Sequence, residues 1–276
     1  ALALATSPWH PRAGALALPP SRSDHCPGAV LLLFETRDGR VVLHTGDFRY
    51  EPSSMALHPA IRRVLQARPS GLDLLYLDTT YLKPQYRFPT QAAVVQHVVD
   101  TCRLLQPSSR TLVLFGSYAI GKERVFLQVA RELNVPIHVE RTKMRLLECM
   151  QLPCDDKARL FSLGPDGREE GAGAFGGVPA RWRVVPMAHL RAPKLRALLA
   201  ASRASFDAIV AFRPTGWCFG GSSSAAGRTV KLGKDLSIVE VPYSEHSSFD
   251  ELRMCVRDLR PQRIVATVNG GPHGQS

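Results

Sequence analysis

The sequence lacks three features that would assign it to particular classes of protein. It has no uncharged run of about 18 apolar residues, so it predicts no membrane-spanning helix. Residues 1–20 are rich in Ala, Leu and Pro but have no basic start before an apolar run, which argues against a signal peptide. The six cysteines include no Cys-x-x-Cys pair, so we expect reduced thiols in a cytosolic or nuclear protein rather than a disulfide framework or a zinc finger.

Acidic residues are few relative to basic ones. The 35 Lys and Arg against 24 Asp and Glu give a formal net charge of +11, which favours polyanionic partners, nucleic acid first. Because the Arg residues are spread along the chain, a basic but merely solvated surface would give the same balance. The 276 residues have an ordinary globular composition and are enough for one large domain or two smaller ones.

The order of the expected elements indicates an α/β fold. Apolar runs at 29–35, 41–47 and 72–78 predict three strands, with an Asp38-Gly39 turn after the first and a helix near 58–67 before the third. From about residue 83, helices and strands alternate, which is typical of a mostly parallel sheet. The expected helices there are 91–105, 121–133, 142–150 and 193–201, the expected strands are 111–115, 136–140, 183–186 and 206–212, and loops rich in Gly or Ser cover 164–177 and 220–227.

The last segment is expected to form a strand, a helix and a strand. The first strand covers 237–242 and leads into a turn that contains His246. Ser248 and Glu251 then have the spacing of a capping box, which predicts the start of a helix that Pro261 ends. The final strand is expected at 263–268.

Four residues of metal-binding or catalytic type lie where strands end. Asp47 and Asp78 each end an expected strand, His25 lies in a turn just before one, and His246 lies between a strand and a helix. In open α/β sheets, ligands and catalytic groups collect at strand ends, and zinc binds His nitrogen and Asp oxygen. Taken singly, each residue could equally be a turn former or a helix cap, so the spacing alone does not establish a metal site.

Six sequence blocks, in a fixed order, carry a specific resemblance. They are His25-Cys26-Pro27-Gly28, His44-Thr45-Gly46-Asp47-Phe48-Arg49, Leu77-Asp78-Thr79-Thr80-Tyr81, Gly116-Ser117-Tyr118-Ala119-Ile120-Gly121-Lys122-Glu123, Arg213-Pro214-Thr215-Gly216-Trp217 and Pro242-Tyr243-Ser244-Glu245-His246-Ser247-Ser248. Together they resemble the DNA cross-link-repair nucleases of the metallo-β-lactamase/β-CASP superfamily, relatives of Artemis and Apollo. The fourth and fifth blocks are most similar to the cross-link-repair 5′ exonuclease branch.

The resemblance implies a fold and a division into domains. It implies a partial metallo-β-lactamase αββα sandwich with an inserted β-CASP α/β domain. On this expectation residues 23–82 form the first metallo-β-lactamase segment, 83–236 form the inserted domain, and 237–276 return to the metallo-β-lactamase part. Residues 1–22 do not match the family and are expected to be a disordered lead-in.

The resemblance also assigns roles at the catalytic site. His25 would be a zinc ligand, and Asp47 a catalytic carboxylate shared between two metal positions. Asp78 would orient His246, which would protonate the leaving group; the alternative for Asp78 is a structural cap on the threonines that follow it. Val268 lies where DNA-directed members have Val and RNA-directed members have His, and no His follows it.

Further residues are candidates for binding substrate phosphate. Ser117, Tyr118 and Lys122 lie between a strand and a helix, and helix N-termini bind phosphate. The alternative is ordinary helix capping with a surface lysine. Thr79 and Arg213 are further phosphate candidates, whereas Trp217 could stack on a base or be a core aromatic of the inserted domain.

The sequence departs from the family in one respect that bears on activity. It contains no His-x-His-x-Asp-His, the motif that supplies most of the family's metal ligands. We therefore expect an N-terminally incomplete chain with little or no nuclease activity by itself. The expected function is that of a zinc-dependent nuclear DNA nuclease, a 5′→3′ exonuclease of interstrand cross-link repair that binds damaged or 5′-phosphorylated DNA strands. The alternatives are a non-catalytic nucleic-acid-binding fragment and an RNA-processing β-CASP nuclease.

Overall fold

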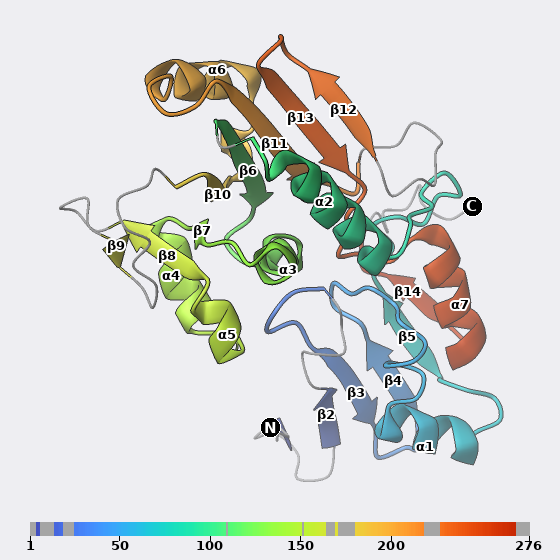
Figure 1. Cartoon of the computed structure of the whole chain (residues 1–276). Coiled ribbons are helices and arrows are strands. Elements are labelled where there is room, and N and C mark those ends of the chain that lie inside the picture. The colour runs from blue at the N-terminus through green and yellow to red at the C-terminus, as the bar shows by residue number, and fades with distance from the viewer. Residues whose placement is uncertain are drawn as a thin grey trace. The chain divides into compact units, whose positions relative to one another are not determined.

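The chain folds into two compact α/β units, one inserted into the other. The computed structural model describes residues 4–5, 14–18, 25–108, 110–150, 152–163, 169–170, 180–217 and 227–268. The first unit combines residues 1–87 with 244–276, and the second consists of residues 88–243 (Figure 1). The α/β class expected from the sequence is confirmed. None of the described helices combines the length and the apolar character needed to cross a membrane.

The first unit contains a mixed sheet in the order β1-β2-β3-β4-β5-β14. Pairs β1–β2, β2–β3 and β3–β4 are antiparallel, whereas β4, β5 and β14 run parallel to one another. Its described strands are β1 (Leu4–Ala5), β2 (Gly14–Leu18), β3 (Leu31–Glu35), β4 (Val41–His44), β5 (Leu74–Leu77) and β14 (Ile264–Ala266), and its helices are α1 (Pro59–Ala67) and α7 (Phe249–Leu259).

Both helices of the first unit contribute to the same hydrophobic core as its strands. Ile61 of α1 and Leu252 of α7 are buried with Leu43 and Leu75 of the central strands. The expected capping box is present at the start of α7, because the Ser248 side chain accepts from the backbone N–H of Glu251 while the Glu251 carboxylate accepts from the backbone N–H of Ser248. The apolar stripe of the helix thereby starts at the position where it can face the sheet.

The second unit contains a larger sheet in the order β12-β13-β11-β6-β10-β7-β8-β9. Its central strands, β13 to β8 in that order, are parallel, and only the outer pairs β12–β13 and β8–β9 are antiparallel. Its described strands are β6 (Thr111–Ser117), β7 (Ile137–His138), β8 (Leu160–Leu163), β9 (Glu169–Glu170), β10 (Trp182–Pro186), β11 (Ala208–Pro214), β12 (Arg228–Lys231) and β13 (Leu236–Val241). Its helices are α2 (Gln91–Leu105), α3 (Glu123–Leu133), α4 (Arg141–Glu148), α5 (Cys154–Lys157) and α6 (Ala192–Ala201), with the 3-10 helix η2 (Met187–His189).

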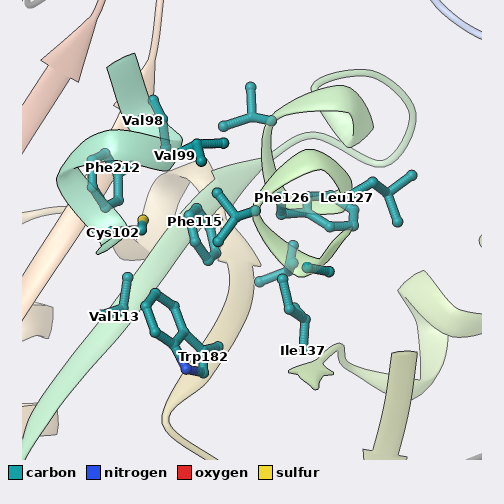
Figure 2. Packing of buried hydrophobic residues seen from close by; sticks show 14 of the residues in the cluster. Val98, Val99, Cys102, Val113, Phe115, Phe126, Leu127, Ile137, Trp182 and Phe212 are labelled. Atoms are coloured by element: carbon teal, nitrogen blue, oxygen red, sulfur yellow. The ribbon is translucent and has the colours of Figure 1, made fainter. Parts of the chain in front are cut away.

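Strand β6 is buried along its whole length because both faces of the sheet are covered. Val113 and Phe115 belong to a core cluster with residues of α2 and α3, whereas the alternate residues Leu112 and Leu114 pack with residues of α6. The Phe115 ring is stacked against Phe212 at 5.6 Å between ring centroids, and Figure 2 shows these residues beside Trp182. This packing fixes the strand from which the loop at Ser117–Lys122 leaves the sheet.

The structure differs from the sequence expectations at the N-terminus, at one domain boundary and in several short elements. Strands β1 and β2 lie within residues 1–22, where a disordered lead-in was expected, because β2 pairs along its length with β3. Residues 237–243, expected in the return segment, belong to the second unit, since β13 pairs with β11. Strands β8, β9 and β12 and the short helix α5 were not predicted. Apart from 169–170 and Gly227, the expected loops 164–177 and 220–227 lie outside the described residues.

The chain positions on the two sides of the insertion are joined within the first unit. The backbone N–H of Phe249 donates to the carbonyl of Tyr86 at 2.9 Å, and Arg87 forms an ion pair with Asp250 at 3.4 Å. The chain therefore leaves the first unit and re-enters it at neighbouring points.

His138 of β7 should make the stability of the protein depend on pH. Burial, together with the positive charge of Arg183, lowers the pKa of His138 from 6.5 to about 4. The folded state favours neutral His138. The unfolding free energy is therefore at its full value above pH 6.5, and it decreases as the pH falls towards 4. We expect His138→Leu to reduce the loss of unfolding free energy between pH 7 and pH 5, measured by urea denaturation.

The exposed His189 offers a matched control for this experiment. His189→Gln should keep the pH dependence of the original chain. An identical pH dependence in His138→Leu and in the unmodified chain would show that His138 titrates normally in the folded state.

Candidate metal and catalytic site

His25 is oriented by a backbone carbonyl. It lies just before β3, in a tight turn in which the backbone N–H of Ala29 donates to the carbonyl oxygen of Cys26. Its Nδ1 lies 3.0 Å from the carbonyl oxygen of Glu245, which can only accept a hydrogen bond. Nδ1 therefore carries the proton, and in the neutral ring Nε2 presents a lone pair. This Nε2 lies 3.9 Å from the Asp47 carboxylate.

Asp47 follows the end of β4 and remains accessible. Gly46 before it has a left-handed backbone, with φ of 56°, which turns the chain out of the strand. The Asp47 side chain is 58% exposed, whereas that of His25 is only 17% exposed. The carboxylate can therefore bind an incoming cation without first breaking a buried hydrogen-bond network.

The buried Asp78 forms a hydrogen-bonded pair with His246, whose side chain is 26% exposed. The Oδ2 atom of Asp78 accepts from His246 Nδ1 at 2.7 Å and from the Phe48 backbone N–H at 3.3 Å. Its Oδ1 atom accepts from the hydroxyl and the backbone N–H of Thr80. The two interpretations of Asp78 are therefore compatible, because one carboxylate orients the histidine and caps the turn.

The surroundings of Asp78 keep it ionised. Burial by itself would raise the pKa of this carboxyl group, but the hydrogen bonds from His246 and Thr80 and the charge of His246 outweigh it, so the pKa lies below its usual 3.8. An ionised Asp78 holds the proton of His246 on Nδ1 and leaves Nε2 as the nitrogen that can bind a metal or exchange a proton.

The fold gathers three metal-binding groups at one place. Ligand atoms of His25, Asp47 and His246 all lie within 4.8 Å of one another, and the two imidazole rings meet edge to face at 4.7 Å between centroids. Two imidazole nitrogens and a carboxylate oxygen are donors that zinc prefers, and a catalytic zinc commonly has three protein ligands and an open position. The residues present therefore fit a divalent transition metal. His246 joins this group, although the family resemblance implied the role of proton donor for it.

Arg49 holds the loop that carries His246, a role that the sequence did not suggest. Its Nη1 donates to the carbonyl of Ser244 at 3.0 Å, and its Nε and Nη2 donate to the Glu251 carboxylate at 3.1 and 2.9 Å. The Arg49 side chain is only 5% exposed. Ser247 adds a second connection by bonding to the backbone of Phe48 and Tyr50. The loop at 244–248 is therefore fixed to the segment that follows Asp47.

Thr79, the phosphate candidate in this unit, is engaged with the backbone. Its hydroxyl donates to the carbonyl of Val268, just beyond β14. The neighbouring Thr45 hydroxyl accepts from the Asp78 backbone N–H and donates to the carbonyl of Gly46. Both threonines thus set the positions of the strand ends around the Asp78–His246 pair.

Three further phosphate candidates, Ser117, Tyr118 and Lys122, lie in the second unit between the end of β6 and the start of α3. The Ser117 hydroxyl donates to the carbonyls of Tyr118 and Gly121, both at 3.0 Å. Lys122 is buried, has a left-handed backbone with φ of 70°, and places its ammonium group 5.2 Å from the centre of the Tyr243 ring and 5.8 Å from that of Tyr118. Such a backbone is uncommon for lysine, and strain of this kind is concentrated at functional loops.

Glu123 and Lys143 complete this loop and were not expected. The Glu123 carboxylate accepts from the Gly121 backbone N–H at 2.8 Å and from the Lys143 ammonium at 2.6 Å. Lys143 also donates to the carbonyls of Tyr118 and Ala119. A negative charge stabilises a helix N-terminus, and at the start of α3 this charge comes from Glu123 of the protein itself.

Arg213, at the end of β11, already has an anionic partner. Its guanidinium lies 3.0 Å from the Glu240 carboxylate, which also pairs with Arg228 at 2.7 Å, and it donates to the carbonyl of Leu190.

The Gly-Lys-Glu sequence contained a signal for Glu123, whereas no local pattern connects Arg49 or Lys143 with their partners.

Removal of the Arg49 guanidinium should destabilise the first unit. Arg49→Met leaves the Glu251 carboxylate and the Ser244 carbonyl without this donor, and loss of one partner of a buried ion pair costs about 3 kcal/mol. We expect a decrease of this size in the urea unfolding free energy, with faster amide hydrogen exchange at 244–248. The exposed Arg62→Met is the control, and equal stability of the two variants would contradict a clamping role.

Comparison with known protein families gives an independent match. The family described as DNA repair metallo-beta-lactamase matches residues 178–272. The chain is 38% identical over 258 residues to the DNA cross-link repair protein SNM1 of Arabidopsis thaliana. The aligned region covers 91% of this chain and 48% of that protein. It is 36% identical to the DNA cross-link repair 1A protein of Gallus gallus, over 90% of this chain and 24% of that protein.

Two further matches bear on activity and on fold separately. The 5′ exonuclease Apollo of Gallus gallus is 30% identical over 90% of this chain and 44% of its own length, so the chain spans less than half of each of these curated relatives. A solved protein of unknown function from Enterococcus faecalis V583 has a TM-score of 0.56 at 15% identity, covers 96% of this chain and 60% of its own, and supports the fold alone. Residues 178–272 thus match the DNA repair metallo-beta-lactamase family, and about 90% of the chain is similar to the cross-link-repair relatives.

Proposed function

We propose that the chain carries part of the catalytic region of a zinc-dependent DNA nuclease, a 5′→3′ exonuclease that acts in interstrand cross-link repair in the nucleus. The observation that carries the proposal is the grouping of His25, Asp47 and His246, with the Asp78 carboxylate bonded to His246 from behind. The names of the relatives, which include cross-link repair proteins and a 5′ exonuclease, support this substrate and this direction of digestion.

In this proposal His25 and Asp47 are the metal ligands. The hydrogen bond from Nδ1 to the Glu245 carbonyl gives His25 the tautomer that a ligand needs, and such outer partners are common for metal-binding histidines. A divalent metal ion, when bound, would supply Lewis acidity and a nucleophile at neutral pH. The exposed Asp47 carboxylate is the group that two metal positions could share.

His246 takes the role of proton donor to the leaving oxygen. Asp78 accepts from Nδ1, so proton exchange falls to Nε2, and an ionised carboxylate beside the ring stabilises the protonated form. A second role is favoured by the position of the ring, because a ligand atom of His246 lies within 4.8 Å of those of His25 and Asp47. A carboxylate–histidine–metal arrangement would then connect Asp78 to the metal.

The distribution of charge supports DNA as the partner. The second unit contains 21 Lys and Arg against 13 Asp and Glu, a net charge of +8, whereas the first contains 14 against 11, a net charge of +3. A surplus of this size attracts the phosphates of a nucleic acid strand. Ser117, Tyr118, Lys122, Thr79 and Arg213 remain the proposed contacts to substrate phosphate, and Val268 favours DNA over RNA.

Metal binding can be tested without any measurement of cleavage. We expect the purified chain to bind Co²⁺, used as a spectroscopic substitute for zinc, and His25→Ala and Asp47→Asn to abolish the absorption bands. If His246 is a third ligand, Asp78→Asn should weaken binding by about 10- to 100-fold, because it removes the outer partner of His246. His97→Gln, in α2 of the second unit, should bind as the unmodified chain does.

His246→Ala separates the two roles of this residue in the same titration. Loss of Co²⁺ binding assigns His246 as a ligand, whereas unchanged binding leaves it as a proton donor. Binding that is equally strong in His25→Ala and in the unmodified chain would show that the metal is bound elsewhere and would contradict the proposed site.

Cleavage is tested on matched DNA and RNA strands that carry a 5′-phosphate. Because the sequence contains no His-x-His-x-Asp-His, we expect little cutting by this chain with added zinc, and DNA cutting from the 5′ end once a segment with that motif is supplied. In the complemented protein, Asp47→Asn should reduce the rate by at least about 100-fold. Preferential cutting of RNA would indicate an RNA-processing nuclease, and no cutting of either strand a nucleic-acid-binding protein.

A further inference from the structure

Two large aromatic side chains of the second unit are exposed at the ends of strands. Tyr118, directly after β6, is 56% exposed, and Trp217, three residues after the end of β11, is 65% exposed. The sequence left Trp217 open as a core aromatic, and its exposure excludes that interpretation. The rings in the core of this unit instead include Phe115, Phe212 and Trp182, each buried.

The two loops that carry these rings leave the same edge of the sheet. Strands β6 and β11 are adjacent and parallel, with Phe115 opposite Phe212 in the register. Neighbouring strands lie about 4.8 Å apart, and the carboxyl ends of parallel strands meet at one edge. Tyr118 and Trp217 therefore extend from neighbouring positions of one edge of the sheet.

The backbone beneath each ring is held in place by hydrogen bonds. The Lys143 ammonium donates to the carbonyls of Tyr118 and Ala119 at 3.1 and 3.0 Å. After β11, the Thr215 backbone N–H donates to the carbonyl of Val241 at 2.9 Å, and the Trp217 backbone N–H donates to the Thr215 hydroxyl at 3.1 Å. The loops thus need little ordering when a ligand arrives, and this lowers the entropic cost of binding.

The chemistry of these surroundings favours one class of ligand. Flat aromatic faces exposed to water gain free energy when another ring covers them, and every nucleobase has such a face. The unit's net charge of +8 attracts a phosphate backbone, and the Lys122 ammonium lies 5.8 Å from the Tyr118 ring. Exposed aromatic faces on a unit with surplus positive charge are the combination that binds single-stranded nucleic acid without sequence preference.

We propose that Tyr118 and Trp217 form a stacking platform for unpaired bases of a single DNA strand. The proposal rests on the proposed DNA-directed function and adds to it the part of the substrate that the second unit binds: the faces of bases rather than phosphates alone. Since each base-stacking contact of this kind is sequence-tolerant, the platform would accept any of the four bases.

The test compares a short single-stranded oligonucleotide with an abasic strand of the same length and charge, by fluorescence anisotropy without added metal. We expect the chain to bind the base-bearing strand more tightly. Trp217→Ala and Tyr118→Ala should each weaken its binding by roughly 5- to 150-fold. Trp217→Ala should leave binding of the abasic strand unchanged, and Trp217→Phe should retain most of the preference for bases.

Leu104 provides the matched control, because it is an apolar residue of the same unit with 83% exposure. Leu104→Ala should bind both strands as the unmodified chain does. Trp217→Gln gives a second, polar replacement in case Trp217→Ala does not fold, which circular dichroism would reveal.

The outcomes separate this inference from the proposed function. If the chain binds both strands equally, or if the Trp217 variants weaken both strands equally, the platform is wrong while a DNA-directed function stands. If neither strand binds to the unmodified chain or to Leu104→Ala, the DNA-directed function fails together with the platform.

Discussion

The hydrogen bond between Asp78 and His246 is the contact on which the candidate site depends. It joins two residues 168 positions apart, one at the end of β5 before the inserted unit and the other in the loop directly after it. It fixes the tautomer of the His246 ring and helps to hold the ring beside His25. The Arg49 contacts and the Tyr86–Phe249 bond strengthen the same junction, so the site and the closure of the first unit are built from one set of interactions.

The sequence predicted much of the architecture because local patterns and tertiary structure agree in the interior. β6 is recognisable because a strand buried on both faces must be apolar throughout, and α7 because Ser248 and Glu251 satisfy the first turn of the helix. β12 was missed because its Arg-Thr-Val-Lys sequence has no apolar alternation, and it forms through pairing with β13. His25, Asp47, Asp78 and His246 were accessible through motifs, whereas Arg49 and Lys143 depend on partners that only the fold brings near.

The structure also changes how the basic residues of the second unit should be understood. Both cations expected to face phosphate have internal partners: Arg213 pairs with Glu240, and the ammonium of Lys122 lies against the rings of Tyr118 and Tyr243. Charges held in this way are pre-oriented, but each must exchange one partner for another before it binds an anion. In the proposed DNA-directed function, recognition of a strand would then rely on shape and on aromatic faces together with charge, and less on direct pairing of each cation with a phosphate.

The short span between Tyr86 and Phe249 has a consequence for how this architecture can vary. A segment whose two ends are already held together by the host adds only a slowly growing closure entropy, about 0.6 kcal/mol for each doubling of its length. The stability of the first unit therefore depends little on the length of the segment inserted between Tyr86 and Phe249. Lengthening, trimming or exchanging the insert would change the second unit while leaving His25, Asp47 and His246 in place.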